Sequence, residues 1–328
     1  MGILLLTKVV FAIMIGFIGA LVLGIFFVPM MRTLHVGQTI SEYVGKNHLK
    51  KSGTPTLGGL IFIIPTIVAT AILVIADKIK FTTNLGIIIL VFTGYAIIGF
   101  LDDFLSIRKK NNEGLTTIQK LVLQVLIALG FFYLYMKSDG TTALTISTLG
   151  IKIEMSWFYS IFLLFVLVGA SNAVNLTDGL DGLAGSLSAV AFLAFALISL
   201  VVGFTEIGIF TFILMGAVVG FLFFNMHPAK IFMGDCGSLS LGATMGAIAI
   251  ITHKELTLFI VALVFVIETL SVILQVFWMF IFHRKLFLMT PLHHHFEKLG
   301  WNEQDIVRMF LAFGLILTMA GIFFGVWL

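Results

Sequence analysis

Ten long apolar runs constrain this chain more than any other feature of its 328 residues. Each run is close to the roughly 20 residues that an α-helix needs to cross a bilayer. The runs cover residues 9–31, 57–76, 81–101, 117–136, 157–174, 184–204, 207–225, 237–252, 256–282 and 307–327. Hydrophobic residues make up 60% of the chain and charged residues 11%, which is more apolar surface than a soluble domain can bury. The sequence therefore predicts an all-α polytopic integral membrane protein, with ten transmembrane helices in one domain, 1–328.

Basic residues are distributed unevenly between the loops on the two sides of these spans. Thirteen of the 19 Lys and Arg residues fall in or beside loops that follow odd-numbered spans. Because cytoplasmic loops carry the excess of basic residues, we predict that those loops are cytoplasmic. Ten spans then place both termini on the extracytoplasmic side.

Two simple counts exclude other classes of function. The net charge of +3 is too small to indicate a nucleic-acid partner. A single cysteine, Cys236, excludes an internal disulfide and a metal site built from several cysteines.

The loop near 143–154 has the alternating pattern of a β-hairpin. Leu144, Ile146, Ile151 and Ile153 alternate with polar residues. We predict a small hairpin facing the extracytoplasmic side, with an unstructured loop as an equal alternative.

Two adjacent carboxylates, Asp102 and Asp103, follow the third apolar run. Adjacent carboxylates repel each other unless a cation lies between them. Acidic residues beside hydrocarbon are costly, and by default they indicate function. The alternative is a solvated helix end, which a pair of such residues makes less attractive than a single one.

A second acidic segment, 172–182, joins the fifth and sixth runs. Asp178 and Asp181 are three residues apart, so they share a face if the segment is helical. Gly179 and Gly182 let the backbone approach a ligand, and the helix that follows offers N–H groups to phosphate. Helix capping is the alternative, but a cap needs only one such residue.

Asp235 lies between two glycines before the eighth run, where it would also serve as a helix cap. Together, five carboxylates from three cytoplasmic segments suit a hard cation. Oxygen ligands favour Mg²⁺, which usually also binds substrate phosphate. The sequence has no cysteine cluster and no H-E-x-x-H motif, so zinc is disfavoured.

Basic and imidazole side chains on the same side suit a phosphate. Lys51, before a Gly/Thr/Pro turn, and Lys120, at the start of the fourth run, can reach a phosphate or a nucleotide. His293, His294 and His295 are consecutive and point in different directions, so they do not form a three-histidine zinc site. We favour contact with phosphate over a solvated loop for them.

Glu268 lies inside the ninth run, away from the other carboxylates. A proton relay through the membrane would need a second mid-span carboxylate, which the sequence does not have. We therefore interpret Glu268 as a hydrogen-bonded packing residue between helices.

Six stretches resemble those of the phospho-N-acetylmuramoyl-pentapeptide transferases, in the polyprenyl-phosphate N-acetylhexosamine-1-phosphate transferase superfamily. The stretches are HLKKSGTPTLGGL at 48–60, GFLDDFLSIRKK at 99–110, SNAVNLTDGLDGLAG at 171–185, FNMHPAKIFMGDCGSLSLG at 224–242, ETLSVILQV at 268–276 and FLMTPLHHHFEKLGW at 287–301. They occur in the order of that family and cover essentially the whole chain. One departure is Cys236, where the family motif has Thr.

This resemblance implies a reaction of bacterial cell-wall synthesis in the plasma membrane. Phospho-MurNAc-pentapeptide passes from UDP-MurNAc-pentapeptide to undecaprenyl phosphate, giving lipid I and UMP. The reaction requires Mg²⁺ and takes place at the cytoplasmic face. The partners are thus the nucleotide donor, the lipid acceptor and membrane lipid.

The resemblance also implies roles for individual residues. It implies that Asp235 is the metal ligand, that Asp102 and Asp103 are catalytic, with Asp102 as base, and that His293 is catalytic and contacts the transferred phosphate. Further residues are expected to bind substrate: Lys51, Thr56, Lys120, Asn175, Asp178, Gly179, Leu180, Asp181, Asn225, Phe232, Ser238, His294 and His295. For Phe232, stacking on uracil is physically reasonable.

Two other functions remain as alternatives. One is a transferase of the same superfamily that moves GlcNAc-1-phosphate to a polyprenyl carrier. The other is a cation-coupled transporter, although transporters place their carboxylates near the bilayer midplane, and here most lie at span ends. Helices of this kind also permit a homodimer, whose face the sequence does not identify.

Overall fold

A computed structural model of the protein describes residues 2–34, 53–109, 114–138, 140–146 and 151–327. The helices are α1 (Ile3–Thr33), α3 (Leu60–Ile75), α4 (Thr83–Lys109), α5 (Thr117–Lys137), α6 (Phe158–Thr177), α7 (Leu183–Val201), α8 (Thr205–Asn225), α9 (Gly234–Ile251), α10 (Glu255–Val261), α11 (Leu263–Phe282), α12 (Leu292–Lys298) and α13 (Glu303–Trp327). Two strands, β1 (Ala143–Ile146) and β2 (Ile151–Glu154), complete the described elements.

Nine of the described helices are long and apolar enough to cross a membrane. The second predicted span is shorter, because residues 57–59 form a turn before the 16-residue α3. The ninth is divided at Ala262 into α10 and α11. The protein is therefore a mainly helical, multi-pass membrane protein, as the apolar runs predict.

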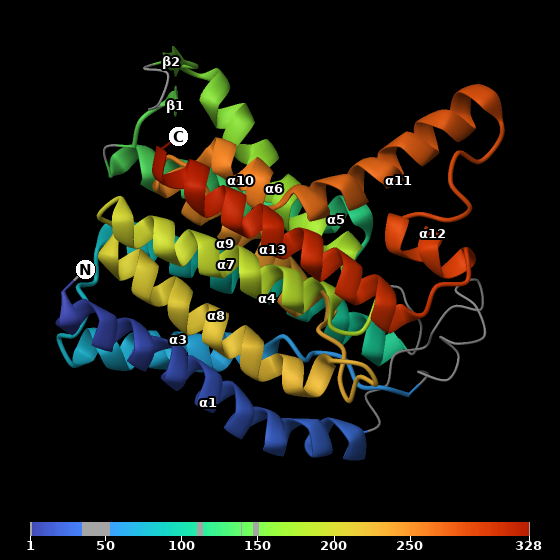
Figure 1. The fold of residues 1–328 in the computed structure, drawn as a ribbon, viewed down its shortest axis with the longest axis horizontal. Coiled ribbons are helices and arrows are strands. Elements are labelled where there is room, and N and C mark those ends of the chain that lie inside the picture. The colour runs from blue at the N-terminus through green and yellow to red at the C-terminus, as the bar shows by residue number, and fades with distance from the viewer. Residues whose placement is uncertain (1, 35–52, 110–113, 139, 147–150, 328) are drawn as a thin grey trace.

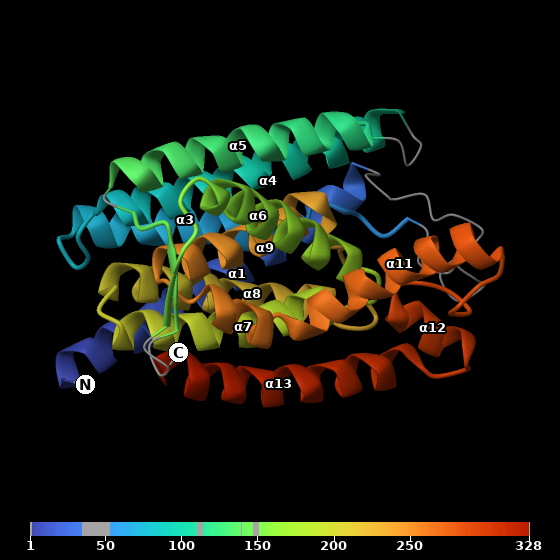
Figure 2. The ribbon, with the colours of Figure 1, turned by 90° about the horizontal axis from the view of Figure 1, so that it is seen from above.

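Helix α9 lies in the middle of the bundle, with α4, α6 and α7 packed against it (Figure 1). In its most apolar 18 residues, 89% are buried, against 17% for α5. Figure 2 shows α5 and α13 on opposite sides of the bundle. The sequence of α9 suits the centre because its Gly, Ala and Ser residues let neighbouring backbones come close.

The two ends of the bundle differ in character. In Figure 1 the β1–β2 hairpin lies at the same end as the two termini, and α12 lies at the other end. The strands pair antiparallel from Ala143 with Glu154 to Ile146 with Ile151. The hairpin predicted near 143–154 is therefore confirmed, and it lies far from α12.

Small residues set the close contact between α1 and α8. A Cβ on Gly16 of α1 would overlap the carbonyl oxygen of Ile213, and one on Gly216 of α8 would overlap that of Ile13. The two glycines thus bring the backbones together reciprocally, as small residues commonly do between membrane helices.

Replacing Gly216 by Leu should force α8 away from α1. Overpacking costs about 1–3 kcal/mol, so the melting temperature in detergent should fall by several degrees. The matched control is Gly130→Leu in α5, where an added Cβ meets no atom within 4 Å. Equal melting temperatures for the two variants would contradict the close α1–α8 contact.

Candidate active site

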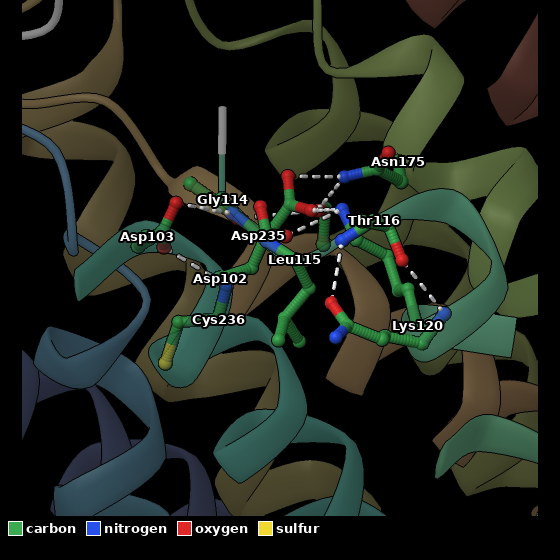
Figure 3. Close-up of polar contacts among 12 residues, drawn as sticks. Asp102, Asp103, Gly114, Leu115, Thr116, Lys120, Asn175, Asp235 and Cys236 are labelled. Atoms are coloured by element: carbon green, nitrogen blue, oxygen red, sulfur yellow. Dashed lines mark hydrogen bonds and ion pairs between the residues drawn. The ribbon is translucent and has the colours of Figure 1, made fainter. Parts of the chain in front are cut away.

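Three carboxylates meet where α4 ends and α9 begins. One oxygen from each of Asp102, Asp103 and Asp235 lies within 4.8 Å of the others. Figure 3 shows these side chains turned toward one another. Gly99 allows the approach, because a Cβ there would overlap the carbonyl oxygen of Asp235. Residues 132 positions apart in the sequence, Asp103 and Asp235, thus become neighbours.

Asp103 caps the start of α9. Its Oδ1 accepts the N–H of Asp235 at 3.2 Å, and its Oδ2 accepts the N–H of Cys236 at 3.1 Å. Only 7% of Asp103 is exposed. The first N–H groups of a helix have no partner within the helix and favour a negative charge. Asp103 therefore fixes the backbone that carries Asp235.

Lys120 joins the other two carboxylates. Its Nζ lies 2.5 Å from Asp235 Oδ2 and 3.2 Å from Asp102 Oδ1. Asp102 Oδ1 also accepts the N–H of Leu115 at 2.8 Å. All three charged side chains are 15–22% exposed, so the pairs are partly shielded from water. One ammonium thus pairs with two carboxylates.

A capping box holds Lys120 in this position. Thr116 Oγ1 accepts the N–H of Gln119 at 3.2 Å, and Gln119 Oε1 accepts the N–H of Thr116 at 2.9 Å. The box fixes the start of α5, and Lys120 lies in the first turn that follows.

Asn175, at the end of α6, orients Asp235 from the other side. Its Nδ2 donates to Asp235 Oδ1 at 2.8 Å and to Ser238 Oγ at 2.9 Å. Thr56 approaches the same corner, because a Cβ on Gly234 would lie 2.6 Å from Thr56 Oγ1. That hydroxyl oxygen is buried and has no hydrogen-bond partner among the described residues.

Asp178 follows the last turn of α6 and is half-buried. Burial, and then the negative charges of Asp235 and Asp181, raise its pKa to about 7. The carboxyl of Asp178 is therefore electrostatically linked to the acidic cluster, which we define as Asp102, Asp103 and Asp235. No hydrogen bond joins Asp178 to this cluster among the described residues. It would become more acidic beside a cation.

Asp181 does not point into this cluster. Its Oδ2 accepts the N–H of Ala229 at 3.0 Å and lies 3.1 Å from His227 Nδ1. Its own N–H donates to Glu303 Oε1 at 2.7 Å. The site residues predicted from the sequence do not include His227 and Glu303, although His227 lies inside the family-like stretch at 224–242. These contacts tie the α6–α7 loop to the α8–α9 loop and to the start of α13.

Asn225 and Phe232 also shape the loops. Asn225 accepts the N–H of Gly182 at 3.2 Å and donates to the carbonyl of Ile231 at 3.0 Å. The backbone of Phe232 pairs with Pro55 and Gly58, at 2.8 and 2.9 Å. Stacking of the Phe232 ring on a base stays a prediction.

The three consecutive histidines have three different partners. His293 Nδ1 lies 3.2 Å from Glu268 Oε2, and His294 Nδ1 lies 2.6 Å from Glu297 Oε2. His295 Nδ1 accepts the N–H of Leu288 at 3.1 Å. The three Nδ1 atoms therefore have separate partners, although the His293 and His294 rings lie against each other, with centroids 4.2 Å apart.

Of the remaining predicted site residues, Gly179 lies against His293, where an added Cβ would overlap the imidazole. Leu180 is buried beside it, with 4% exposed. Lys51 lies outside the described residues, so its predicted contact with substrate stays a prediction.

The donor atoms of the first cluster suit a hard divalent cation. Asp102, Asp103 and Asp235 offer carboxylate oxygens only, which fits the preference of Mg²⁺ and Ca²⁺. A second group with suitable spacing, formed by Asp181, His227 and Glu303, mixes nitrogen and oxygen. We favour the first group because it offers oxygen atoms alone and includes Asp235, the predicted metal ligand.

Comparison with known proteins identifies relatives over nearly the full length of the chain. The family described as glycosyl transferase family 4 matches residues 85–253. The phospho-N-acetylmuramoyl-pentapeptide-transferase of Geobacillus kaustophilus is 46% identical over 98% of both chains. Those of Bacillus licheniformis and Bacillus subtilis are 45% and 44% identical, again over 98% of both chains.

This chain belongs to the phospho-N-acetylmuramoyl-pentapeptide-transferase family. The match to glycosyl transferase family 4 spans α4 to α9 and so includes every member of the acidic cluster. The full-length relatives extend the match over most of the remaining chain, at 98% of its length.

Removing the charge of Lys120 should increase the affinity of the acidic cluster for divalent cations. A cation must compete with the Lys120 ammonium for Asp102 and Asp235, and charges about 4 Å apart repel by about 4 kcal/mol at an effective dielectric constant of 20. We expect Lys120→Met to bind Mn²⁺ at least about tenfold more tightly, since 1.4 kcal/mol is a factor of ten. Electron paramagnetic resonance of free Mn²⁺, without substrate, measures this.

The control is Lys109→Met on α4. Lys109 is exposed and donates to the carbonyl of Gly114 at 3.3 Å, outside the three carboxylates. Equal Mn²⁺ affinity in Lys120→Met and the wild type would contradict competition between the ammonium and the metal.

Proposed function

We propose that this protein transfers phospho-MurNAc-pentapeptide from UDP-MurNAc-pentapeptide to undecaprenyl phosphate. The products are lipid I and UMP, in the first membrane step of peptidoglycan synthesis. The observation that carries the proposal is the convergence of three carboxylates and Lys120 at one end of an apolar helix bundle. A soluble donor and a lipid acceptor can meet at such an end, because it borders both water and hydrocarbon.

Mg²⁺ is the cofactor of the proposed reaction. Asp235 would hold it, with Asp102 and Asp103 close enough to assist. When bound, the ion neutralises charge on the diphosphate and assists departure of UMP. The all-oxygen donor set supports this choice over zinc.

The protein's own residues have three tasks in this proposal. Asp102 acts as the base that takes a proton from the lipid phosphate. Among the described residues its hydrogen bonds engage Oδ1 only, which leaves Oδ2 for the substrate. Asp103 keeps the start of α9 in place, and Lys120 can turn from the carboxylates to the diphosphate. The acceptor oxygen then bonds to the phosphorus that carries the sugar, while the bond to UMP breaks.

Positioning, charge compensation and shielding from water supply most of the catalysis in such a transfer. The attacking phosphate is already anionic, so a covalent aspartyl-phosphate is not required. We therefore favour direct attack. We also propose that the substrate contacts the residues predicted from the sequence: Thr56, Asn175, Gly179, Leu180, Asn225, Phe232, Ser238, His294 and His295, with Asp178 and Asp181 in the α6–α7 loop and Lys51 outside the described residues.

The proposal includes ten membrane crossings in one domain. Helix α3 counts as one crossing, and α10 together with α11 counts as another. The eight other long apolar helices of the described residues bring the total to ten. An even number agrees with the two termini lying at one end of the bundle (Figure 1). The excess of basic residues in loops at the acidic end supports a cytoplasmic active site in the bacterial plasma membrane. A homodimer also stays part of the proposal, to be tested by mass in detergent.

The two alternative functions fit the geometry less well. A coupled transporter would need carboxylates near the midplane, whereas the acidic cluster lies at the ends of α4 and α9. Glu268, the mid-span carboxylate, is paired with His293. Transfer of GlcNAc-1-phosphate differs in the sugar alone, so the donor used in the assay separates it.

Purified protein should release UMP from UDP-MurNAc-pentapeptide when undecaprenyl phosphate and Mg²⁺ are present. We expect Asp235→Asn to reduce the rate by at least about 100-fold, because it removes the central carboxylate of the metal site. Chelation of Mg²⁺ should abolish release in the wild type. UDP-GlcNAc serves as the control donor, and release from it alone would move the protein to the sister activity. Release from neither donor by folded protein would refute the transferase function.

A single introduced cysteine should report which end of the bundle faces outward. Cys236 is buried and so gives little background. Lys152→Cys in β2, where the native side chain is 60% exposed, should react with a membrane-impermeant maleimide in intact cells. Lys298→Cys at the end of α12 should react only after permeabilisation. The reverse pattern would invert the proposed topology.

A further inference from the structure

The carboxylate of Glu268 is fully buried within α11, an apolar membrane-spanning helix. A carboxylate inside the membrane is costly unless it is paired, and such residues usually mark function. Its Oε2 lies 3.2 Å from His293 Nδ1, and its Oε1 has no hydrogen-bond partner among the described residues. The imidazole is thus the side chain to which Glu268 is bound.

His293 uses one ring nitrogen for this contact and presents the other elsewhere. The ring is 0% exposed, and Nε2 has no hydrogen-bond partner among the described residues. Nε2 is directed at Gly179, where a Cβ would overlap it. A buried nitrogen without a partner calls for an explanation, and a ligand is one. This one faces the α6–α7 loop, one residue from Asp178.

A second polar side chain on the same face of α11, Gln275, bonds the segment between α11 and α12 that precedes His293. Gln275 lies seven residues, about two turns, beyond Glu268. Its Oε1 accepts the N–H groups of Leu286 and Phe287 at 3.0 and 2.9 Å, and its Nε2 donates to the Phe287 carbonyl at 3.2 Å. Two polar side chains of α11 therefore fix the connection to α12 and α12 itself, Gln275 through the backbone of that connection and Glu268 through the His293 imidazole.

We propose that Glu268 is a positioning residue that acts through His293. It accepts the Nδ1–H of the imidazole, which fixes both the tautomer and the orientation of the ring. His293 then meets the phosphate being transferred through Nε2 alone. This inference rests on the proposed function, in which His293 contacts that phosphate.

A packing role for Glu268 would predict something different. Apolar side chains of similar size pack buried space at least as well as an ion pair does. A carboxylate that only fills space could therefore be replaced by its amide with little change in turnover. A carboxylate that orients a histidine could not, because the amide can donate as well as accept and no longer selects one tautomer.

The test compares wild-type protein with Glu268→Gln, His293→Gln and the double variant. We expect Glu268→Gln to lower kcat by about 100-fold, the loss typical of a misplaced reacting group, with KM for the nucleotide donor nearly unchanged. The double variant should be no slower than His293→Gln, because groups that act as a unit are not additive. Glu255→Gln is the matched control. The Glu255 carboxylate is also buried and accepts a hydrogen bond from the Tyr159 hydroxyl at 2.6 Å. It follows the end of α9, whereas Asp235 lies at the start of that helix, so the kcat of Glu255→Gln should stay near that of the wild type.

Nitrogen-15 NMR of histidine-labelled protein gives a readout that does not depend on turnover. The His293 signal, assigned by its loss in His293→Gln, should show the proton on Nδ1 in the wild type and a mixture of tautomers in Glu268→Gln. A proton on Nε2 in the wild type would overturn the proposal even if Glu268→Gln failed to fold. Unchanged kcat in Glu268→Gln, or additive losses in the double variant, would do the same. Absence of UMP release by the wild type would instead refute the proposed function, while the NMR result would still decide whether Glu268 orients His293.

Discussion

The contact between the Asp103 carboxylate and the first N–H groups of α9 is the constraint on which the site depends. It joins the end of one buried helix to the start of another, and Gly99 makes room for it. A hydrogen bond in a water-poor environment is electrostatically stronger than one in bulk water. The position of Asp235 follows from it, because Asp235 supplies one of the capped N–H groups. Asn175 and Lys120 then only have to orient a side chain whose backbone is already fixed.

Charge compensation explains why these groups come together from separate helices. Carboxylates at the edge of hydrocarbon repel one another, and the single positive charge of Lys120 is shared between only two of the three. The remaining negative charge makes the site attractive to a divalent cation, and a phosphate substrate in turn needs that cation. The site therefore suits an anionic substrate only when a divalent cation is bound to the carboxylates and the Lys120 ammonium is also present. Asp178, with its pKa raised to about 7, belongs to the same balance.

The sequence predicted the helices better than the contacts between them. Apolar runs determine where a membrane helix must lie, so each predicted span has a matching helix. The bounds differ in places, because α1 already starts at Ile3, α4 continues past its apolar run to Lys109, α3 starts late and a break at Ala262 divides the ninth span. The sequence also placed the aspartates on one side of the membrane. It could not show that Lys120 contacts Asp235, 115 residues away, or that Asp181 turns to His227. Such pairings depend on how α5, α8 and α9 pack, which no local pattern encodes.

Buried polar atoms without a hydrogen-bond partner indicate where a substrate can bind. At the acidic end, most polar side chains named above bond to another part of the chain, and this satisfies groups that burial would otherwise penalise. The buried atoms without such a partner among the described residues include Thr56 Oγ1 and His293 Nε2. Thr56 Oγ1 lies beside Gly234, at the metal side of the site, and His293 Nε2 lies beside Gly179, at the loop side. A diphosphate held between the acidic cluster and the α6–α7 loop would offer oxygens to both, and so would supply the hydrogen-bond partners that the described residues do not give these two atoms.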